Sequence, residues 1–322
     1  MPRYLLWRVV QFAPVLWVVA TLLFVLVQLT PGGPIVALAG EFAEVDTIRQ
    51  IERQLGLDLP LAQQYGQFLG RLAYGDLGFS YFYKAPVLEV ILSRLPATLV
   101  LVFASLALSA ALGVMLGIIS ARGGSGAVVI LLVALLTLAL PVFWLGHLLR
   151  LGLSVELGLF PVQGMSNARI EHTGLASALD VARHAALPVL TLVLHQLAFA
   201  ILLTRAAMAV ETQRPYYLTA RAKGHTRLGA ELGHAFPNAS LPIVTLFANR
   251  AGGFIAGTVL VETVFAWPGL GQLVTGAIAN RDRPLVIGIV LLVTLATLVA
   301  NLIADIYAFW LDPRIAPERR PA

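Results

Sequence analysis

Long apolar runs separated by polar segments dominate the hydrophobic pattern of this chain. The runs cover residues 9–29, 97–120, 127–149, 187–210, 241–264 and 285–310. Each run is long enough to cross the ~30 Å hydrocarbon layer of a bilayer as a helix rising 1.5 Å per residue. The pattern predicts an all-α polytopic membrane protein with about six transmembrane helices. Pro141 lies inside the third run, and we expect the helix to continue through it, because membrane helices tolerate proline where neighbours satisfy the freed carbonyl.

The polar segments predict how the chain is oriented. Arginines precede the first run and occupy the short loop before the third, whereas acidic residues slightly outnumber basic ones between the first two runs. The positive-inside rule therefore predicts cytoplasmic termini and an extracytoplasmic insertion. The expected organisation is residues 1–30 for the N-terminus and first helix, 31–96 for the extracytoplasmic region, 97–311 for a transmembrane core with a cytoplasmic loop at 211–238, and 312–322 for the tail.

Two shorter patterns lie in the external segments. Apolar residues recur at helical spacing over residues 45–55 and again over 61–72, which predicts two short amphipathic helices. The connection at residues 265–284 is rich in glycine and proline and is expected to form turns.

Composition excludes several classes of protein. The 322 residues are 58% hydrophobic and 12% charged, which is too apolar for a soluble domain of this size. The net charge of +5 is explained by basic residues in short loops, so no nucleic-acid partner is needed and membrane lipid is the expected surrounding. The absence of cysteine excludes disulfides and cysteine-ligated metals.

The longest basic interruption, residues 205–242, is the most distinctive polar stretch. It predicts a short helix over residues 217–224 closed by a glycine, and a second helix over 227–236 stopped by Pro237. Thr219, Ala220, Ala222 and Gly224 are small, so a partner backbone can approach them closely. An ordinary positive-inside loop remains the alternative interpretation.

No motif in the sequence provides catalysis or nucleotide binding. Neither Lys84 nor Lys223 belongs to a phosphate-binding loop, and metalloprotease and serine-hydrolase motifs are absent. We therefore expect no enzyme activity, cofactor or metal in this chain. Candidate residues for a translocation path are Asn249, Arg250 and Glu262. A charge inside the membrane is costly, so Arg250 meets a substrate carboxylate, forms a buried ion pair with another helix, or lies at a shallower depth because its helix starts later.

Several motifs, taken together and in order, resemble one family. The segment 219–224, with Phe236 and Pro237 downstream, resembles the cytoplasmic "EAA" loop of ABC importer permeases, in the branch that serves dipeptides, oligopeptides and nickel. Leu218 stands where that loop usually has an acidic residue. Further matching segments lie at residues 31–34, 55–60, 64–65, 75–80, 94–98, 262–271 and 312–314.

The resemblance implies a function and partners. A family member is one of two permease subunits in the cytoplasmic (inner) membrane of a prokaryote, working with a homologous second permease, two ATPase subunits or domains that bind ATP and Mg, and an extracytoplasmic solute-binding protein. The expected cargo is a peptide. The expected ATPase-coupling residues are Thr219, Ala220, Arg221, Ala222, Lys223, Gly224 and Pro237. An ion-coupled secondary carrier for a small solute is the alternative.

Overall fold

The protein is described by a computed structural model that defines the backbone of residues 2–29, 58–167 and 173–311. Side chains are described for the same residues except 2–5, 245–246, 248–253, 255–256 and 308–311. The elements are α1 (Pro2–Val10), α2 (Phe12–Leu29), α5 (Leu61–Ala73), β1 (Phe79–Ser80), β2 (Ala85–Pro86), α6 (Val87–Ala121), α7 (Ser125–Ala139), α8 (Val142–Leu149), the π-helix η1 (Arg150–Glu156), α9 (Leu175–Glu211), α10 (Pro215–Ala222), α11 (Arg227–Ala230), the π-helix η2 (Glu231–Ala235), α12 (Phe236–Val264), α13 (Leu270–Ala279) and α14 (Arg283–Leu311).

The apolar helices confirm a mainly helical polytopic membrane protein. Within the described residues, four helices are long and apolar enough to cross a membrane, at Leu6–Leu29, Val87–Ala121, Leu175–Glu211 and Arg283–Tyr307. A fifth candidate is the bent pair α7 and α8–η1. The predicted span at 241–264 falls within α12, whose side chains are only partly described. The total of six spans, the side of the termini and the external insertion remain predictions.

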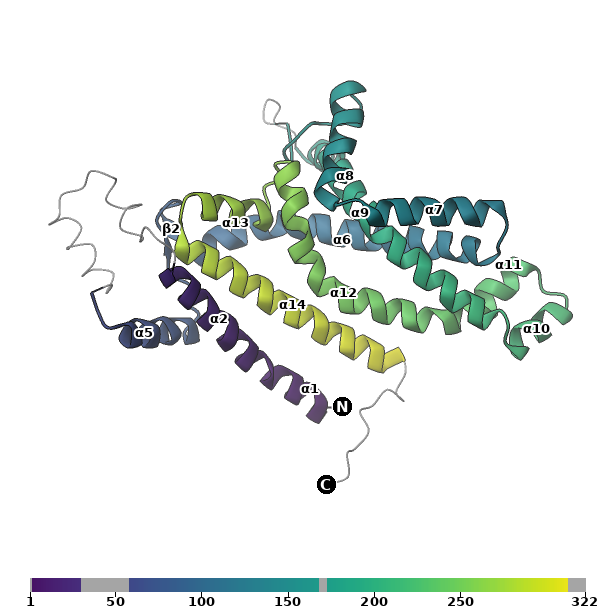
Figure 1. The fold of residues 1–322 in the computed structure, drawn as a ribbon, viewed down its shortest axis with the longest axis horizontal. Helices are drawn as coiled ribbons and strands as arrows, with labels where there is room; N and C mark the ends of the chain where they lie inside the picture. Colours follow the sequence, from purple (N-terminus) through teal and green to yellow (C-terminus); the bar gives the residue numbers. More distant parts are fainter. Residues whose placement is uncertain (1, 30–57, 168–172, 312–322) are drawn as a thin grey trace. The chain divides into compact units, whose positions relative to one another are not determined.

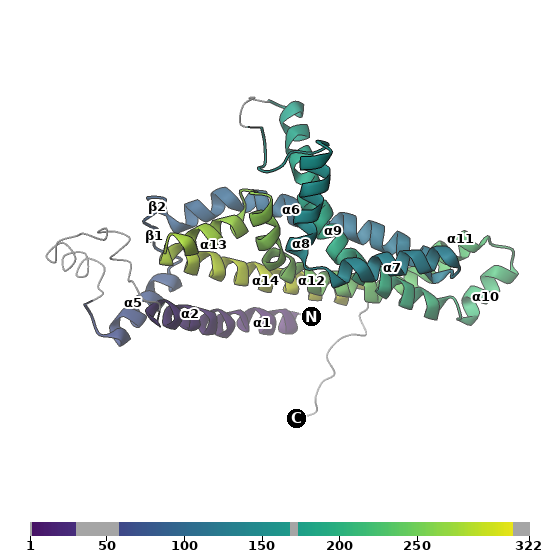
Figure 2. The ribbon, with the colours of Figure 1, turned by 45° about the horizontal axis from the view of Figure 1, so that its top comes forward.

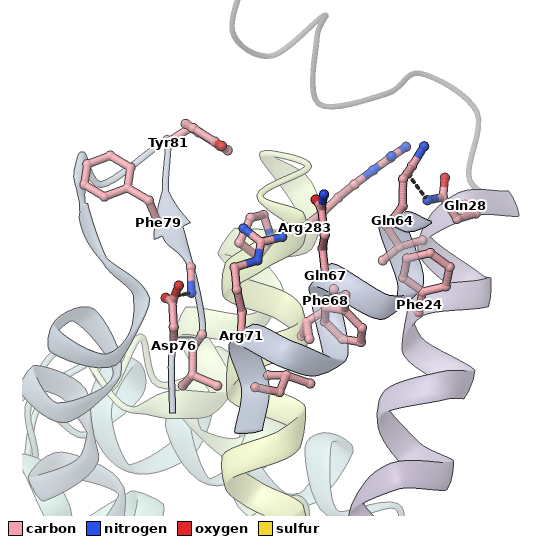
Figure 3. A pocket seen from close by; sticks show the side chains of 16 residues that line it. Phe24, Gln28, Gln64, Gln67, Phe68, Arg71, Asp76, Phe79, Tyr81 and Arg283 are labelled. Carbon is pink, nitrogen blue, oxygen red and sulfur yellow. Dashed lines mark hydrogen bonds between the residues drawn. The ribbon is translucent and has the colours of Figure 1, made fainter. Parts of the chain in front are cut away.

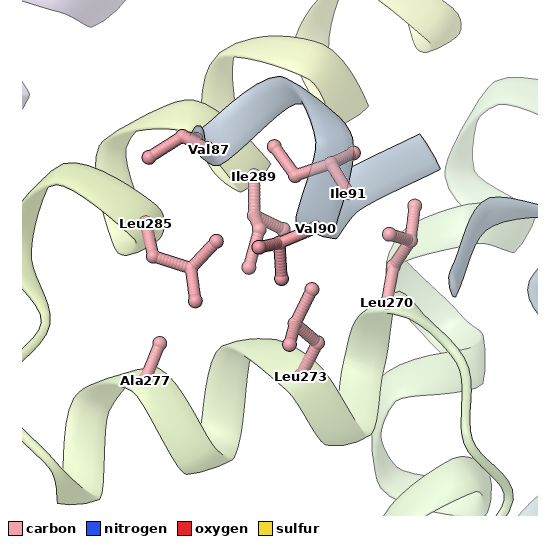
Figure 4. Packing of buried hydrophobic residues seen from close by; sticks show 8 residues of the cluster. All are labelled: Val87, Val90, Ile91, Leu270, Leu273, Ala277, Leu285 and Ile289. Carbon is pink, nitrogen blue, oxygen red and sulfur yellow. The ribbon is translucent and has the colours of Figure 1, made fainter. Parts of the chain in front are cut away.

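The chain divides into two units, which share α6 and α14. The first unit comprises Met1–Thr98 and Pro268–Leu298, and its core joins the start of α6 to α13 and α14. Figure 4 shows this core. Its buried members are Val87, Val90, Ile91, Leu270, Leu273, Ala277, Leu285 and Ile289.

A two-stranded hairpin precedes α6 in the first unit. β1 and β2 pair antiparallel, with Phe79 opposite Pro86 and Ser80 opposite Ala85. The buried Ser80 hydroxyl donates a hydrogen bond to Asp282 Oδ2 at 2.5 Å. Because Asp282 directly precedes α14, this bond fixes the hairpin to the start of that helix.

Helix α9 is the centre of the second unit, which comprises Leu99–Trp267 and Val299–Ala322. In its most apolar window 56% of residues are buried, more than in the other three long apolar helices of the described residues. It packs against α7, α8 and α12, and Figures 1 and 2 both show α7 alongside it. Gly113 of α6 lies directly against Ala200 of α9, so the two backbones approach closely.

The expectation that a helix runs unbroken through Pro141 was wrong. α7 ends at Ala139, α8 begins at Val142, and the two axes differ by 108°, a bend visible in Figure 2. Leu140 is extended, with φ −86° and ψ 132°. Proline drives the preceding residue out of the helical region and cannot donate a hydrogen bond itself, so here it breaks the helix.

Other helix limits also differ from the sequence expectation. α6 begins at Val87 and α9 at Leu175, ahead of the apolar runs at 97–120 and 187–210. The helical backbone therefore extends beyond the apolar residues. The connection at 265–284 contains α13, a ten-residue helix that is too short to span a membrane. The amphipathic pattern at 61–72 is α5, as predicted. The pattern at 45–55 lies outside the described residues.

The contact between α6 and α9 generates a stability prediction. A Cβ added at Gly113 would collide with Ala200, whereas a Cβ at Gly126 in α7 would meet nothing within 4 Å. We expect Gly113→Ala to destabilise the protein by about 2 kcal/mol through overpacking. The matched change Gly126→Ala should be neutral or slightly stabilising. Thermal unfolding of both variants in detergent measures the difference, and equal midpoints would contradict the close contact.

Candidate functional site

The basic stretch after α9 folds into a short helix with a glycine stop, as the sequence predicts. α10 begins with Pro215 in its first turn, where the missing N–H costs nothing. At its end, the N–H of His225 donates to the carbonyl of Ala220, and that of Gly224 to Arg221. This is a Schellman cap, and Gly224 takes the required positive φ of 91°. Figure 1 shows α10 and α11 as consecutive short helices after α9.

The second half of the stretch differs from the prediction that Pro237 stops a helix. α11 is followed directly by the π-helical turn η2, and α12 then begins at Phe236. Pro237 therefore lies in the first turn of α12, where proline is compatible with a helix. The chain consequently passes from the loop into the long helix α12 without a break.

The inner face of α10 packs on the protein's own core. Tyr217 and Ala220 are buried, and they belong to a cluster with Ile118 of α6 and Met208 of α9. Three alanines of α11, η2 and α12 complete this cluster: Ala230, Ala235 and Ala239. Small side chains thus allow α10 to approach three helices, and the loop does not depend on a partner to bury this face.

A buried carboxylate anchors the loop to the end of α6. Glu231, the first residue of η2, is 2% exposed. Arg122, which directly follows α6, donates to Glu231 Oε2 from Nη2 at 2.6 Å and from Nε at 2.9 Å. Arg227 donates from Nε to Oε1 at 3.0 Å. We call Arg122, Arg227 and Glu231 the arginine–glutamate cluster.

The sequence contained only a weak signal for this cluster. Glu231 is one of two acidic residues in the basic stretch, and Arg122 was used only to assign the side of its loop. The two residues are 109 positions apart, so no local spacing rule joins them. A carboxylate within a cationic segment was the available indication that a specific pair exists.

The outer face of α10 presents the remaining predicted coupling residues to solvent. Thr219, Arg221, Ala222, Lys223 and Gly224 are exposed, whereas Ala220 faces inward. Leu218 is 57% exposed on the same helix. Nearby Leu228 and Leu232 are 53% and 48% exposed. The result is a surface of small, basic and apolar side chains, and such exposed apolar groups suit contact with another protein.

The predicted path residues all belong to α12. Asn249 and Arg250 lie within the α12 backbone, but their side chains lie outside the described residues. Glu262, near the end of α12, is fully buried. Across residues 2–29, 58–167 and 173–311, no group of three or more His, Cys, Asp or Glu side chains is placed to hold a metal ion.

The arginine–glutamate cluster predicts a measurable coupling energy. Removing one partner of a buried ion pair costs about 3–5 kcal/mol, and the partial exposure of Arg122 reduces the expected loss for Arg122→Ala to about 2 kcal/mol. The exposed Arg214→Ala should change stability by less than about 0.5 kcal/mol. In a Glu231→Gln background the Arg122→Ala effect should shrink. Unfolding in detergent measures all five proteins: the unaltered protein, the three single variants and the double variant. Strictly additive effects of Arg122→Ala and Glu231→Gln would contradict the pair.

Sequence comparison with known proteins identifies the family. The family described as binding-protein-dependent transport system inner membrane component matches residues 113–317, and the N-terminal family of the same transport system membrane components matches residues 1–102. The arrangement of helices resembles the crystal structure of an amino acid ABC transporter with histidines, with a TM-score of 0.51 and 16% identity over 68% of this chain and 93% of that one.

Relatives match along almost the whole chain. A di/tripeptide transport system permease of Pseudomonas aeruginosa is 36% identical, covering 95% of this chain and 96% of the relative. A dipeptide transport system permease of Escherichia coli K12 is 33% identical, and a putative peptide transport system permease of Brucella suis is 35% identical; both cover 98% of this chain and 99% of the relative. These matches do not favour the ion-coupled carrier. The chain belongs to the binding-protein-dependent transport system inner membrane component family, as a permease subunit of an ABC importer in the inner membrane.

Proposed function

We propose that this chain forms one of the two transmembrane halves of an ATP-driven peptide importer. The names of its full-length relatives support a peptide cargo. Membership of the family supports the presence of ATPase subunits and a solute-binding protein in the assembly. The proposed partners are a homologous second permease, two ATPase subunits that bind ATP and Mg, and an extracytoplasmic binding protein. Residues 31–96 are proposed to face that binding protein.

We further propose that the exposed face of α10 contacts an ATPase subunit. The observation that carries this assignment is the division of α10 into two faces. Tyr217 and Ala220 are buried and anchor the helix to the protein's own core. Thr219, Ala222 and Gly224 are exposed, and their small size leaves the backbone accessible to a partner. The Thr219 hydroxyl donates a hydrogen bond to the carbonyl of Pro215 at 2.9 Å. This hydroxyl therefore needs no acceptor from a partner protein. Arginine and lysine beside it supply charge-dependent contacts.

The anchoring of α10 also supports a mechanism of transmission. A partner that moves α10 also displaces the cluster formed by Ile118, Met208 and the loop alanines, because these residues are buried together in one apolar cluster. The arginine–glutamate cluster carries the same displacement to the end of α6. Movement at one loop thereby reaches α6, α9 and α12 together. We propose that this unit rocks between the inward-open and outward-open states. Asn249, Arg250 and Glu262 stay predictions for the path itself.

A bulky substitution on the exposed face tests the contact. We expect Ala222→Trp to lower recovery of the ATPase subunits with the tagged permease at least about tenfold, because a large ring prevents close approach to a surface made of small residues. The protein itself should remain folded, since Ala222 is exposed. Co-purification in mild detergent and ATP-driven uptake of peptide in vesicles give the two readouts.

The matched control is Ser125→Trp, an equally large change at the exposed first residue of α7. This variant should retain the ATPase subunits and transport. Normal recovery and uptake with Ala222→Trp would refute the assignment of α10. Stable gradient-driven uptake by the chain alone, without ATPase subunits, would instead refute the importer proposal.

A further inference from the structure

A second candidate site lies in the first unit, at a cavity of about 180 Å³ bounded by α2, α5, the hairpin segment and the start of α14. Figure 3 shows the side chains of Gln67 and Arg71 rising from α5, with Phe79 and Tyr81 across from them. The cavity is smaller than the ~300–1,000 Å³ typical of sites for drug-sized ligands. It therefore suits a small ligand, of the size of one or two amino-acid residues.

The polar wall of the cavity comes from one face of α5. Gln64, Gln67 and Arg71 follow each other at intervals of three and four residues, which places them on the same side of the helix. Gln64 is already oriented, because its amide nitrogen donates to Leu59 O at 2.8 Å and its oxygen accepts from Gln28 Nε2 at 3.0 Å. Within the described residues, the side chains of Gln67 and Arg71 make no hydrogen bond or ion pair.

The charges around the cavity favour an anionic group. Among the described residues that line it, Arg71 and Arg283 are accompanied by one carboxylate, that of Asp76. Asp76 Oδ1 accepts a hydrogen bond from Gly78 N at 2.8 Å, so this carboxylate is fixed in the turn before β1. The Arg71 guanidinium makes no ion pair within the described residues, so it is suited to bidentate binding of a ligand carboxylate.

The opposite walls are apolar and aromatic. Phe24 and Phe68 stack with ring centroids 5.5 Å apart, and Phe79 and Tyr81 come from β1 and the turn that follows it. Burial raises the pKa of Tyr81, and the nearby positive charge of Arg71 opposes that rise. The phenol therefore stays protonated at neutral pH and can donate a hydrogen bond. Such walls accommodate an apolar side chain of a ligand, and the Tyr81 hydroxyl can orient the ligand by a hydrogen bond.

We propose that this cavity binds the C-terminal end of a short peptide, with its carboxylate on Arg71, its last amide at Gln67 and its side chain against the aromatic walls. The site holds cargo within the first unit. This inference rests on the proposed peptide cargo. A free peptide end fits better than an acidic side chain of a partner protein, because Gln67 offers an amide donor and acceptor that a lone carboxylate does not use.

The test uses the purified complete transporter in detergent without its binding protein. Alanyl-alanine and its C-terminal amide are titrated, and saturation-transfer NMR gives the Kd of each. We expect the free acid to bind about tenfold more tightly than the amide, as a charge-assisted bidentate pair implies. Arg71→Gln should weaken binding of the acid about tenfold and abolish the preference. Arg71→Lys should retain part of it, because the charge remains but the planar fork is lost.

Arg183→Gln is the matched control, since it removes one exposed positive charge that does not line the cavity. It should leave both Kd values unchanged. Equal binding of acid and amide by the unaltered transporter would overturn the proposal even if Arg71→Gln failed to assemble. An unchanged Kd for alanyl-alanine in Arg71→Gln would also overturn the proposal. This holds even if that variant no longer docks the binding protein.

Uptake into vesicles with the binding protein present separates this inference from the proposed function. If the unaltered transporter imports no peptide on addition of ATP, the peptide-importer proposal fails. If it imports peptides while acid and amide bind equally, the importer proposal stands and only the cavity assignment fails.

Discussion

A carboxylate removed from water must be compensated by charge and hydrogen bonds, and Glu231 imposes this constraint on the loop between α9 and α12. Its two compensating guanidiniums come from different segments, Arg122 after α6 and Arg227 in α11. The carboxylate can therefore be satisfied only when the end of α6 and the start of η2 lie together. The packing of Tyr217 and Ala220 is compatible with that same placement, so charge pairing and apolar burial favour one arrangement of the loop.

Proline shows why part of the fold could be predicted from the sequence and part could not. Pro96 and Pro188 lie inside α6 and α9, Pro141 separates α7 from α8, and Pro237 lies in the first turn of α12. The local chemistry of each proline is the same, but the outcome depends on whether neighbouring groups satisfy the freed carbonyl. Apolar run length is a stronger signal, because crossing a bilayer requires a minimum number of residues, and it located the long helices of the described residues.

The candidate site divides in the same way. Local rules predicted α10 and its glycine stop, since the αL requirement at Gly224 involves only adjacent residues. They did not separate the inward Ala220 from the outward Ala222, because both residues are small and two positions apart. Nor did they predict the arginine–glutamate cluster or the cavity beside α5, whose parts are distant in sequence and meet only through tertiary packing.

The π-helical turn η2 determines how α12 is rotated relative to α11. A π turn holds more residues than an α turn, and each residue advances a regular helix by about 100°. Removing one residue from Glu231–Ala235 would restore regular winding and rotate all of α12 about its axis relative to α11. The π-helical turn therefore sets the rotation of α12 about its own axis. Glu231 can face Arg122 and Arg227 while the direction in which the α12 side chains point is set separately, by the number of residues in the turn.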